Sequence, residues 1–585
     1  MIPHAIMPAF FRRDGRIPAV WLLALPPVLV VFFSFILPYG ASFEPAIRGA
    51  APGGNASIEQ LSLWENSGIL RITLFTVKQA FFSVLVSLAL GLPGAWILGR
   101  KGAAARSPFT SVLRSLTAIP FAMPSILVVL GFVLFFGNSG WLNRLFAAIT
   151  GVGEGPFRIL YKPEAIILAH GFFNFPLVIR LAGDGLDRAR RAYASAAASL
   201  GASPLVCSLT ILLPLTVPAL MSAILLVFLY SFTSFAVVLV LGGGPAATTL
   251  AVEIYRYARI FLNYHNAAVL ALLETLIAVC LFLTYVFFGK KSREIKTDLQ
   301  ERVIEERQNL SFRKKINGSA LARMFAIALY GSVLIFFVLG PLLSIPLESL
   351  LSQSSRSSAQ TISLRWWLSL GDTCLPALFR SLLVAFLSAT IACVLAVLAA
   401  GSVKILEEQG RGNAVKANIV RFLAAAPLVS SGIVLGLGWL VVYGRNFSRS
   451  PLALVILHAV IALPFAFNSI SEGFRSLPVN TLNAAMVFGA GPLRGLLTTA
   501  IPLSLSRIRS AWGFAAALSL GELNAVMMLG IEDWETLPLY IYRAVGAYRY
   551  GAACAAGTLL ILGCAAGFLL SETQNIRLGR KKNGS

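Results

Sequence analysis

The stretch that decides the fold occurs twice: residues 195–214 read SAAASLGASPLVCSLTILLP, and residues 483–502 read NAAMVFGAGPLRGLLTTAIP. The alanines, the glycine and the two prolines keep the same intervals, and the copies lie about 288 residues apart. Small residues followed by glycine and then proline predict a helix, a tight turn and a second short helix. Matched spacing in two places indicates an internal repeat rather than coincidence.

The composition identifies the class of protein. Of 585 residues, 57% are hydrophobic and 12% are charged, whereas soluble proteins carry about twice that charged fraction. We therefore predict a polytopic protein whose surroundings are the lipid bilayer. The formal charge of +23 is spread over short loops, so it predicts membrane topology and no nucleic-acid partner.

Apolar runs of about 18 or more residues predict about 12 membrane-spanning helices, six in each half. The predicted spans are 19–39, 70–98, 112–137, 164–182, 215–241, 267–289, 324–346, 376–402, 419–444, 452–471, 506–530 and 552–571.

The basic residues predict the orientation. About 33 of the 48 Lys and Arg fall in the termini and in every second loop, and the repeated stretches lie in two of these loops. Both termini and both repeated loops are therefore expected in the cytoplasm. An even number of spans in each half predicts a parallel repeat, with two like-oriented halves around one central path.

These features divide the chain into five parts. They are a cytoplasmic N-terminus (1–18), a first half (19–289, with its repeated loop at 183–214), a charged cytoplasmic linker (290–323), a second half (324–572, with its repeated loop at 472–505) and a basic cytoplasmic tail (573–585).

The repeated loop resembles the cytoplasmic loop of permease subunits in ATP-binding-cassette importers, which runs Glu-Ala-Ala, three residues, Gly, nine residues, Ile-x-Leu-Pro. The first copy departs from this pattern at Ser195, and the second at Asn483, Thr499 and Ile501. The resemblance implies a type I, MetI-like, all-α fold with two tandem six-helix halves in the bacterial inner membrane. It also implies that each loop forms a coupling helix. The matching residues are Ser195, Ala196, Ala197, Gly201, Pro204, Ile211, Leu213, Pro214, Asn483, Ala484, Ala485, Gly489, Pro492 and Pro502.

The same resemblance implies the partners: two copies of a cytoplasmic ATPase subunit and an extracytoplasmic substrate-binding protein. The chain itself has no GxxxxGK[ST] run and no HExxH spacing. The glycines at 242–244 are followed by Pro245, which excludes a phosphate-binding loop. We therefore expect no enzymatic activity, no metal and no cofactor bound by this chain, with ATP and Mg held by the ATPase. The six cysteines form no CxxC pair, which favours a packing role.

Further motifs resemble bacterial thiamine importer permeases. They are LAHGFFNFP at 168–176, SFA at 234–236, LGGGPAATT at 241–249, SLGE at 519–522 and TLPLYIY at 536–542. What this implies is import of thiamine or its phosphates. Fused ferric-iron permeases share much of this pattern and remain an alternative. A secondary transporter needs no ATPase, but it would be expected to carry broken helices or coupling-ion acids, and it leaves the repeated loops unexplained.

A few polar residues within the predicted spans are candidates for the translocation path: Glu522, Glu274, His170, His458 and Ser234. Ionisable groups in a bilayer usually face a cavity or a partner. Glu522 either offers a negative surface to a cationic thiazolium, or makes a helix–helix hydrogen bond or lies at the membrane interface, and both interpretations stay open. Glu274 is a weaker candidate, and for the two histidines packing or hydrogen bonding is favoured over a substrate contact.

Overall fold

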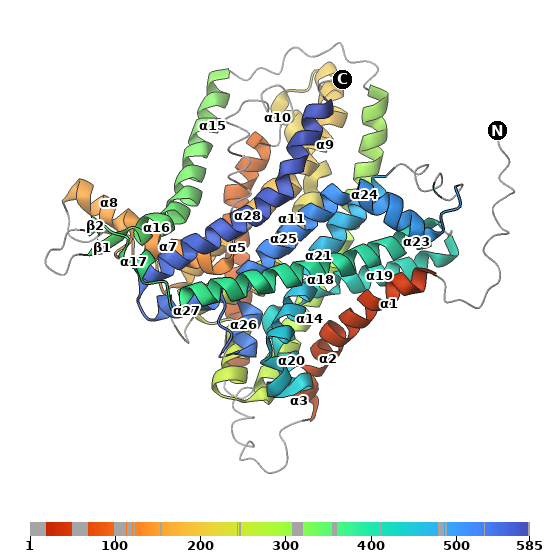
Figure 1. Cartoon of the computed structure of the whole chain (residues 1–585). Helices are drawn as coiled ribbons and strands as arrows, with labels where there is room; N and C mark the ends of the chain where they lie inside the picture. The colour runs from red at the N-terminus through yellow and green to blue at the C-terminus, as the bar shows by residue number, and fades with distance from the viewer. Residues whose placement is uncertain are drawn as a thin grey trace, which may run out of the picture.

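The computed structural model describes most of the chain (Figure 1). The described residues are 19–48, 68–98, 123–151, 155–242, 247–306, 320–353, 360–408, 411–477, 488–531 and 533–582, together with Leu113, Thr117, Pro120, Gly244 and Ala485.

The regular elements among the described residues of the first half are all helices. Its elements are α1 (Ala19–Val31), η1 (Phe32–Ile36), α2 (Leu37–Ala41), α3 (Glu44–Arg48), α5 (Gly68–Leu98), α7 (Ser125–Phe136), α8 (Trp141–Thr150), α9 (Pro163–Ser199), α10 (Pro204–Cys207), η3 (Ser208–Leu212), α11 (Leu213–Phe232), α12 (Ala236–Leu241), α13 (Leu250–Tyr255), η5 (Arg256–Ile260) and α14 (Tyr264–Glu306).

The second half repeats this order and adds one small antiparallel strand pair, β1 (Leu351–Gln353) with β2 (Gln360–Ile362). Its helices are α15 (Ala320–Leu334), η6 (Ile335–Leu339), α16 (Gly340–Ser349), α17 (Arg365–Leu368), α18 (Cys374–Glu408), η7 (Arg411–Asn413), α19 (Ala414–Ala425), η8 (Ala426–Val429), α20 (Gly432–Ser448), α21 (Pro451–Arg475), α23 (Pro492–Gly495), η9 (Leu496–Ala500), α24 (Ile501–Leu503), α25 (Leu505–Gly521), α26 (Asn524–Leu529), α27 (Leu537–Gly546) and α28 (Tyr550–Lys582).

The described residues contain ten helices that are long and apolar enough to cross a membrane, or eleven if the bent pair Ala414–Leu428 and Gly432–Gly444 is one span. That pair is bent by 101°. The remaining predicted span, 506–530, is present but divided, because α25 ends at Gly521 and α26 begins at Asn524. The fold is an all-α polytopic membrane protein.

Two helices extend well beyond a bilayer. The 37 residues of α9 and the 43 residues of α14 rise by about 55 and 65 Å, whereas the hydrocarbon core is about 30 Å thick. The far end of α9 therefore reaches the first repeated loop outside the membrane. α14 continues to Glu306, into the segment predicted to be the charged linker.

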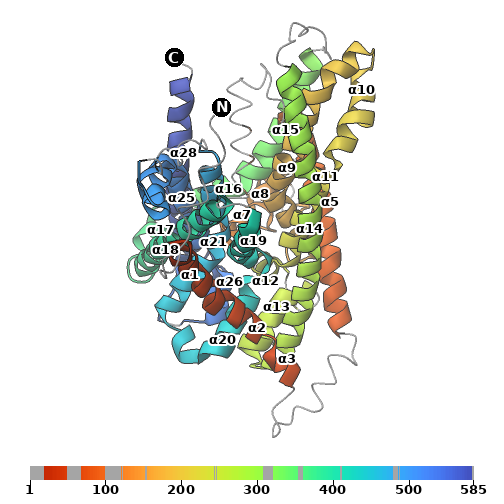
Figure 2. The ribbon, with the colours of Figure 1, turned by 90° about the vertical axis from the view of Figure 1, so that its right-hand side faces the viewer.

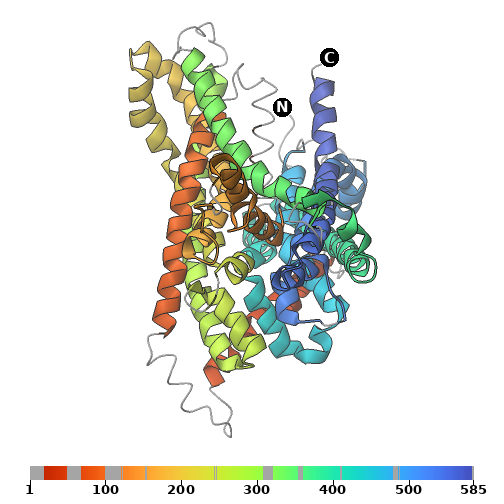
Figure 3. The same ribbon diagram turned by 90° about the vertical axis from the view of Figure 1, so that its left-hand side faces the viewer.

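The first helix of each half packs against the other half. α1 and α2 lie along α18 and α20 of the second half, and Figure 2 shows them beside α19 and α20. α15 and α16 lie along α5 and α7 of the first half, and Figure 3 shows the green α15 next to the orange α5. We call α1 with α2, and α15 with α16, the exchanged arms, because each pair packs on the other half. Hydropathy did not predict this exchange.

Glycines permit this close approach. A Cβ built on Gly438 of α20 would collide with the carbonyl oxygen of Pro38 in α2, and one on Gly131 of α7 would lie 2.6 Å from the carbonyl oxygen of Pro341 in α16. Because Gly131 and Gly438 occupy the same position in α7 and α20, the contact is made twice, once in each direction.

Each arm also contains a π-helical turn, η1 or η6, which leaves backbone carbonyls without their usual partners. Trp439 Nε1 donates to the Ser34 carbonyl at 2.9 Å, and the Tyr443 hydroxyl donates to the Phe33 carbonyl at 2.5 Å. The equivalent positions in α7 are Phe132 and Phe136, whose rings pack against Phe337 of η6 instead. The two arm contacts share a backbone geometry but differ in chemistry.

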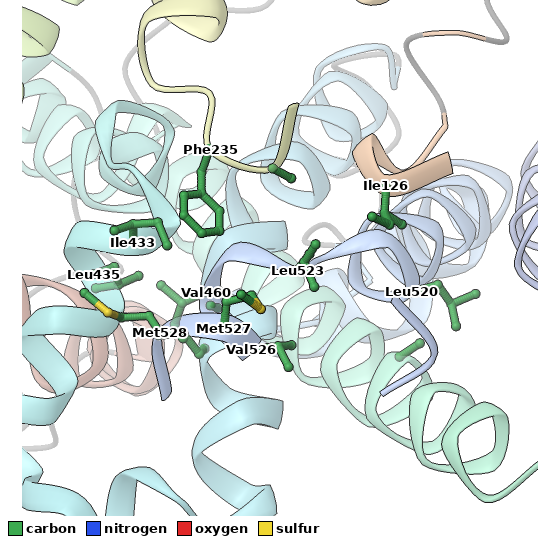
Figure 4. Close-up of a cluster of buried hydrophobic side chains, with 14 of the residues drawn as sticks. Ile126, Phe235, Ile433, Leu435, Val460, Leu520, Leu523, Val526, Met527 and Met528 are labelled. Carbon is green, nitrogen blue, oxygen red and sulfur yellow. The ribbon is translucent and has the colours of Figure 1, made fainter. Parts of the chain in front are cut away.

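The buried core is continuous between the halves. Figure 4 shows Ile126 of α7 and Phe235 of the first half beside Val460, Leu523 and Met527 of the second. The interface between the halves is therefore packed like the interior of a single domain rather than like a loose subunit contact.

Candidate coupling loops and translocation path

The two repeated loops have the same backbone geometry. Gly201 and Gly489 have φ of +80° and +79°, the left-handed conformation that favours glycine. The next residue closes the turn in each copy, since the Ala202 amide donates to Ala197 O and the Ala490 amide to Ala485 O, both at 3.0 Å. This is a Schellman-type helix end, so the intervals shared by the two stretches encode one helix-terminating turn.

The short helix after each turn is continuous with the following span. α10 passes through the π-helical turn η3 into α11, and α23 passes through η9 into α24, with bounds displaced by the same interval. Ala197 is buried and Ile211 is partly buried where the end of α9 packs against this segment. In the structure, these two side chains hold the short helix against the end of α9.

The most exposed side chain of each turn is large and apolar. Leu200 is 88% exposed and Phe488 is 90% exposed, and they precede the two left-handed glycines. Leu209 and Leu497, which are also equivalent, are each 56% exposed. Sequence reasoning missed these residues because the family pattern fixes no side chain at their positions; a large apolar residue beside a turn glycine was the available signal.

The other predicted loop residues are placed as follows. Ala196, Leu213, Pro214 and Pro502 are exposed, and Ala485 is partly buried. Asn483 and Ala484 lie outside the described residues, as do the side chains of Ser195, Pro204 and Pro492.

The predicted path residues Ser234 and Glu522 lie at equivalent breaks in their spans. α11 ends at Phe232 and α12 begins at Ala236, while α25 ends at Gly521 and α26 begins at Asn524. This corrects the expectation that Glu522 lies within a continuous span. Its carboxylate accepts the Ala525 amide at 3.1 Å, so it caps α26. Neither open interpretation of Glu522 included this cap.

The two acids Glu274 and Glu522 come from different halves but lie beside the same bend. Glu522 Oε1 is 3.4 Å from the Cβ position of Gly432, where α20 begins. Glu274 of α14 is 1% exposed and lies next to the hydroxyl of Ser431. The structure thus brings the two predicted acids to the 101° bend between Ala414–Leu428 and Gly432–Gly444, which together form the ninth predicted span.

The two histidines are buried equivalents outside this acidic region. His170 Nδ1 donates to Gln79 Oε1 at 3.0 Å, and Gln79 Nε2 donates to Ser231 O at 2.8 Å. His458 Nδ1 is hydrogen-bonded to the Ser519 hydroxyl at 2.8 Å. Each ring ties together spans of its own half, the arrangement expected of a packing histidine.

One family model matches the chain: residues 91–293 match the binding-protein-dependent transport system inner membrane component. This region contains the first repeated loop, the break at Ser234 and Glu274.

Full-length relatives extend the similarity across both halves. The "Thiamine transport system permease protein ThiP" of Brucella abortus (strain 2308) is 28% identical over 540 residues, which cover 92% of each chain. The protein of the same name from Escherichia coli (strain K12) is 26% identical over 508 residues, covering 86% of this chain and 89% of that one.

A half-length relative shows how the chain is divided. The "Putative 2-aminoethylphosphonate transport system permease protein PhnU" of Salmonella typhimurium is 28% identical over 269 residues, 46% of this chain but 91% of that protein. About half of this chain thus corresponds to nearly a whole permease. The chain is thus similar to the binding-protein-dependent transport system inner membrane component over residues 91–293, and over about nine-tenths of its length to permease proteins named for thiamine transport.

Proposed function

We propose that this chain is the permease subunit of an ATP-driven importer that moves thiamine or its phosphates into the cell. The observation that carries this proposal is the similarity, along about nine-tenths of both chains, to several proteins named as thiamine transport permeases. The deciding experiment is growth rescue of a thiamine auxotroph that lacks its own importer. An iron-limited strain serves as the parallel test, because rescue there and not of the auxotroph would favour the ferric-iron alternative.

ATP and Mg are held by a partner ATPase in this proposal, and two ATPase copies each receive one repeated loop. The turns at Gly201 and Gly489 have the same backbone conformation. This supports the proposal, because two copies of one ATPase subunit need two docking loops of the same shape. The exposed Leu200 and Phe488 supply apolar anchors of the kind that carry most of the energy of an interface. We expect both loops, both termini and the charged linker to face the cytoplasm, with the binding protein outside.

The exchanged arms suggest how force passes between the halves. Since α2 packs on α20 and α16 packs on α7, each half carries a helix of the other when it tilts. Closing of the ATPase dimer then rocks the two halves about the central path, and the arms keep them from separating.

The acids beside the span 9 bend are proposed to favour a cationic substrate. Glu522 already caps α26 through one oxygen, so it offers its remaining oxygen. Glu274 is buried beside the hydroxyl of Ser431. Burying a carboxyl group inside a membrane protein is costly, which favours a functional role for Glu274 over a purely structural one.

A secondary transporter is the alternative from another class. Broken spans do occur here, at Ser234 and Glu522, so their absence cannot be used against it. The half-length permease relative and the two equivalent loop turns favour the ATP-driven interpretation. Vanadate-sensitive uptake by the reconstituted complex would separate the two, because a secondary transporter is insensitive to an ATPase inhibitor.

A further inference from the structure

A pocket of about 230 Å³ lies between the two halves. Tyr255 and Arg259 line it from the first half, and Met527, Gly530 and Tyr542 are among the residues that line it from the second. Tyr255 and Arg259 lie between the predicted spans 215–241 and 267–289, Met527 and Gly530 lie at the end of the predicted span 506–530, and Tyr542 lies between that span and 552–571. The charge pattern predicts that these segments face the extracytoplasmic side. Met527 is labelled in Figure 4, at the buried contact between the halves.

The two tyrosines are equivalent residues of the repeat. α13 and α27 follow Thr249 and Thr536, which have the same extended backbone, and each tyrosine comes six residues later. The two helices are also anchored alike. The Leu250 amide donates to the hydroxyl of Thr76 in α5, and the Leu537 amide to the hydroxyl of Ser381 in α18.

Two equivalent residues can share one pocket only if it lies beside the axis that relates the halves. The pocket that holds both Tyr255 and Tyr542 is therefore at the axial mouth of the path between the halves. A substrate released along this axis by an external binding protein must pass it.

The charge of the pocket is not symmetric. Arg543 is paired with Glu535 at 2.9 Å, and Arg256, just outside the pocket, is paired with Glu253 at 2.6 Å. Within the part of the chain that the structure describes, Arg259 makes no ion pair or hydrogen bond. Its guanidinium lies against Gly530, a left-handed glycine at which any side chain would collide with it.

The polar groups of the pocket are suited to an anion. Burial raises the pKa of both the Tyr255 and the Tyr542 phenols, so both hydroxyls stay protonated and able to donate. A guanidinium with unused N–H groups matches the geometry of a phosphate, and tyrosine rings pack well against a flat heteroaromatic ring.

We propose that Arg259, with Tyr255 and Tyr542, forms an entry site that binds the phosphate of a phosphorylated heteroaromatic substrate. This rests on the proposed function and deepens it, because it assigns to one residue the distinction between thiamine and its phosphate esters. Free thiamine lacks the anion and makes no equivalent contact with Arg259.

The test uses the complete complex, with its ATPase and binding protein, in proteoliposomes. Uptake of labelled thiamine and of labelled thiamine monophosphate is measured for the wild type, Arg259→Gln and Arg259→Lys. We expect Arg259→Gln to lower uptake of the monophosphate at least about tenfold while thiamine uptake stays within about twofold, since a hydrogen-bonded charge is lost for one substrate only. Arg259→Lys keeps the charge and should retain part of the monophosphate uptake. Arg365→Gln, an exposed arginine of α17, is the matched control.

Four results would overturn the inference. Equal losses for both substrates would mean that Arg259 serves the binding protein or the fold. Unchanged uptake of both would leave the site without a role. A wild type that carries thiamine but not its monophosphate would show that the site has no phosphorylated substrate to bind. A wild type that carries neither would instead refute the proposed function and the inference with it.

Discussion

Replacing Gly438 of α20 with alanine should weaken the packing of α2, part of the exchanged arm of the first half, against the second half. The added methyl group would overlap the Pro38 carbonyl oxygen and lie 3.2 Å from its Cα. Both are backbone atoms of α2, so no side chain can rotate away to make room. The arm itself must move outward, and Trp439 in the next position would then lose its 2.9 Å hydrogen bond to Ser34 O.

The expected cost is the sum of two effects. Overpacking a well-packed contact costs about 1–3 kcal/mol. Losing the hydrogen bond to a buried carbonyl adds about 1 kcal/mol. We therefore expect Gly438→Ala to destabilise the protein by about 2–4 kcal/mol. Gly131→Ala, where the nearest oxygen is 2.6 Å away and no indole bond is at risk, should cost about 1–3 kcal/mol.

The assay is unfolding of the purified protein in mixed micelles of increasing SDS content, followed by circular dichroism. Gly40→Ala is the matched control, because it lies in the same arm and nothing is within 4 Å of its Cβ position. Alanine is the better helix former there, so this variant should be as stable as the wild type or slightly more so. A cysteine pair across α2 and α20 should also cross-link less readily in Gly438→Ala. Wild-type stability and cross-linking in Gly438→Ala would refute the exchanged-arm contact.

Three further predictions concern coupling and the path. Gly489→Val forces a branched side chain into the left-handed region at a cost of at least about 1–2 kcal/mol, so it should leave the protein in the membrane but uncouple ATP hydrolysis from uptake; normal coupled uptake would contradict the loop assignment. Leu200→Ser with Phe488→Ser should weaken co-purification with the ATPase at least about tenfold, because each side chain loses about 2 kcal/mol of apolar burial; unchanged recovery of the complex would reject both anchors. Glu522→Gln keeps the cap on α26 and removes only the ionisable carboxyl group, as Glu274→Gln does at its own site, and uptake of a cationic substrate should fall about tenfold in at least one of the two variants; wild-type uptake in both would show that neither acid serves the path.

The repeat, the apolar segments and the loop turns could be predicted because each is encoded locally. A glycine that must adopt a left-handed conformation, followed by proline, specifies a helix end wherever it occurs. The left-handed turns at Gly201 and Gly489 bear this out. The roles of the loop residues toward an ATPase stay predictions.

The exchanged arms could not be predicted from hydropathy. A span that faces lipid and a span that faces another helix are equally apolar, so a run such as 19–39 does not indicate its neighbour. The signal that existed was the pair Gly131 and Gly438, at matched positions in spans 3 and 9. Their partners, Pro38 and Pro341, are distant in sequence, and no local rule connects them.

The breaks near Ser234 and Glu522 were hidden for a different reason. Hydropathy averages over a window longer than the few residues at which the helix stops, so 506–530 was predicted as one span. An acid within an apolar run was the visible sign of a break. Its meaning became clear only when the carboxylate was seen to cap the next helix.

Fusion of the two halves allows differences that a symmetric dimer cannot have. The scaffold is repeated closely, yet equivalent positions carry Ser234 against Glu522, and Arg259 against Gly546. In a homodimer every substitution would appear on both sides of the axis, so an acid or an arginine would face its own copy. A substrate with a cationic ring at one end and a phosphate at the other is itself asymmetric. A single chain that places a carboxylate in one half and an unpaired guanidinium in the other can match such a substrate, and this gives a physical reason for joining the halves.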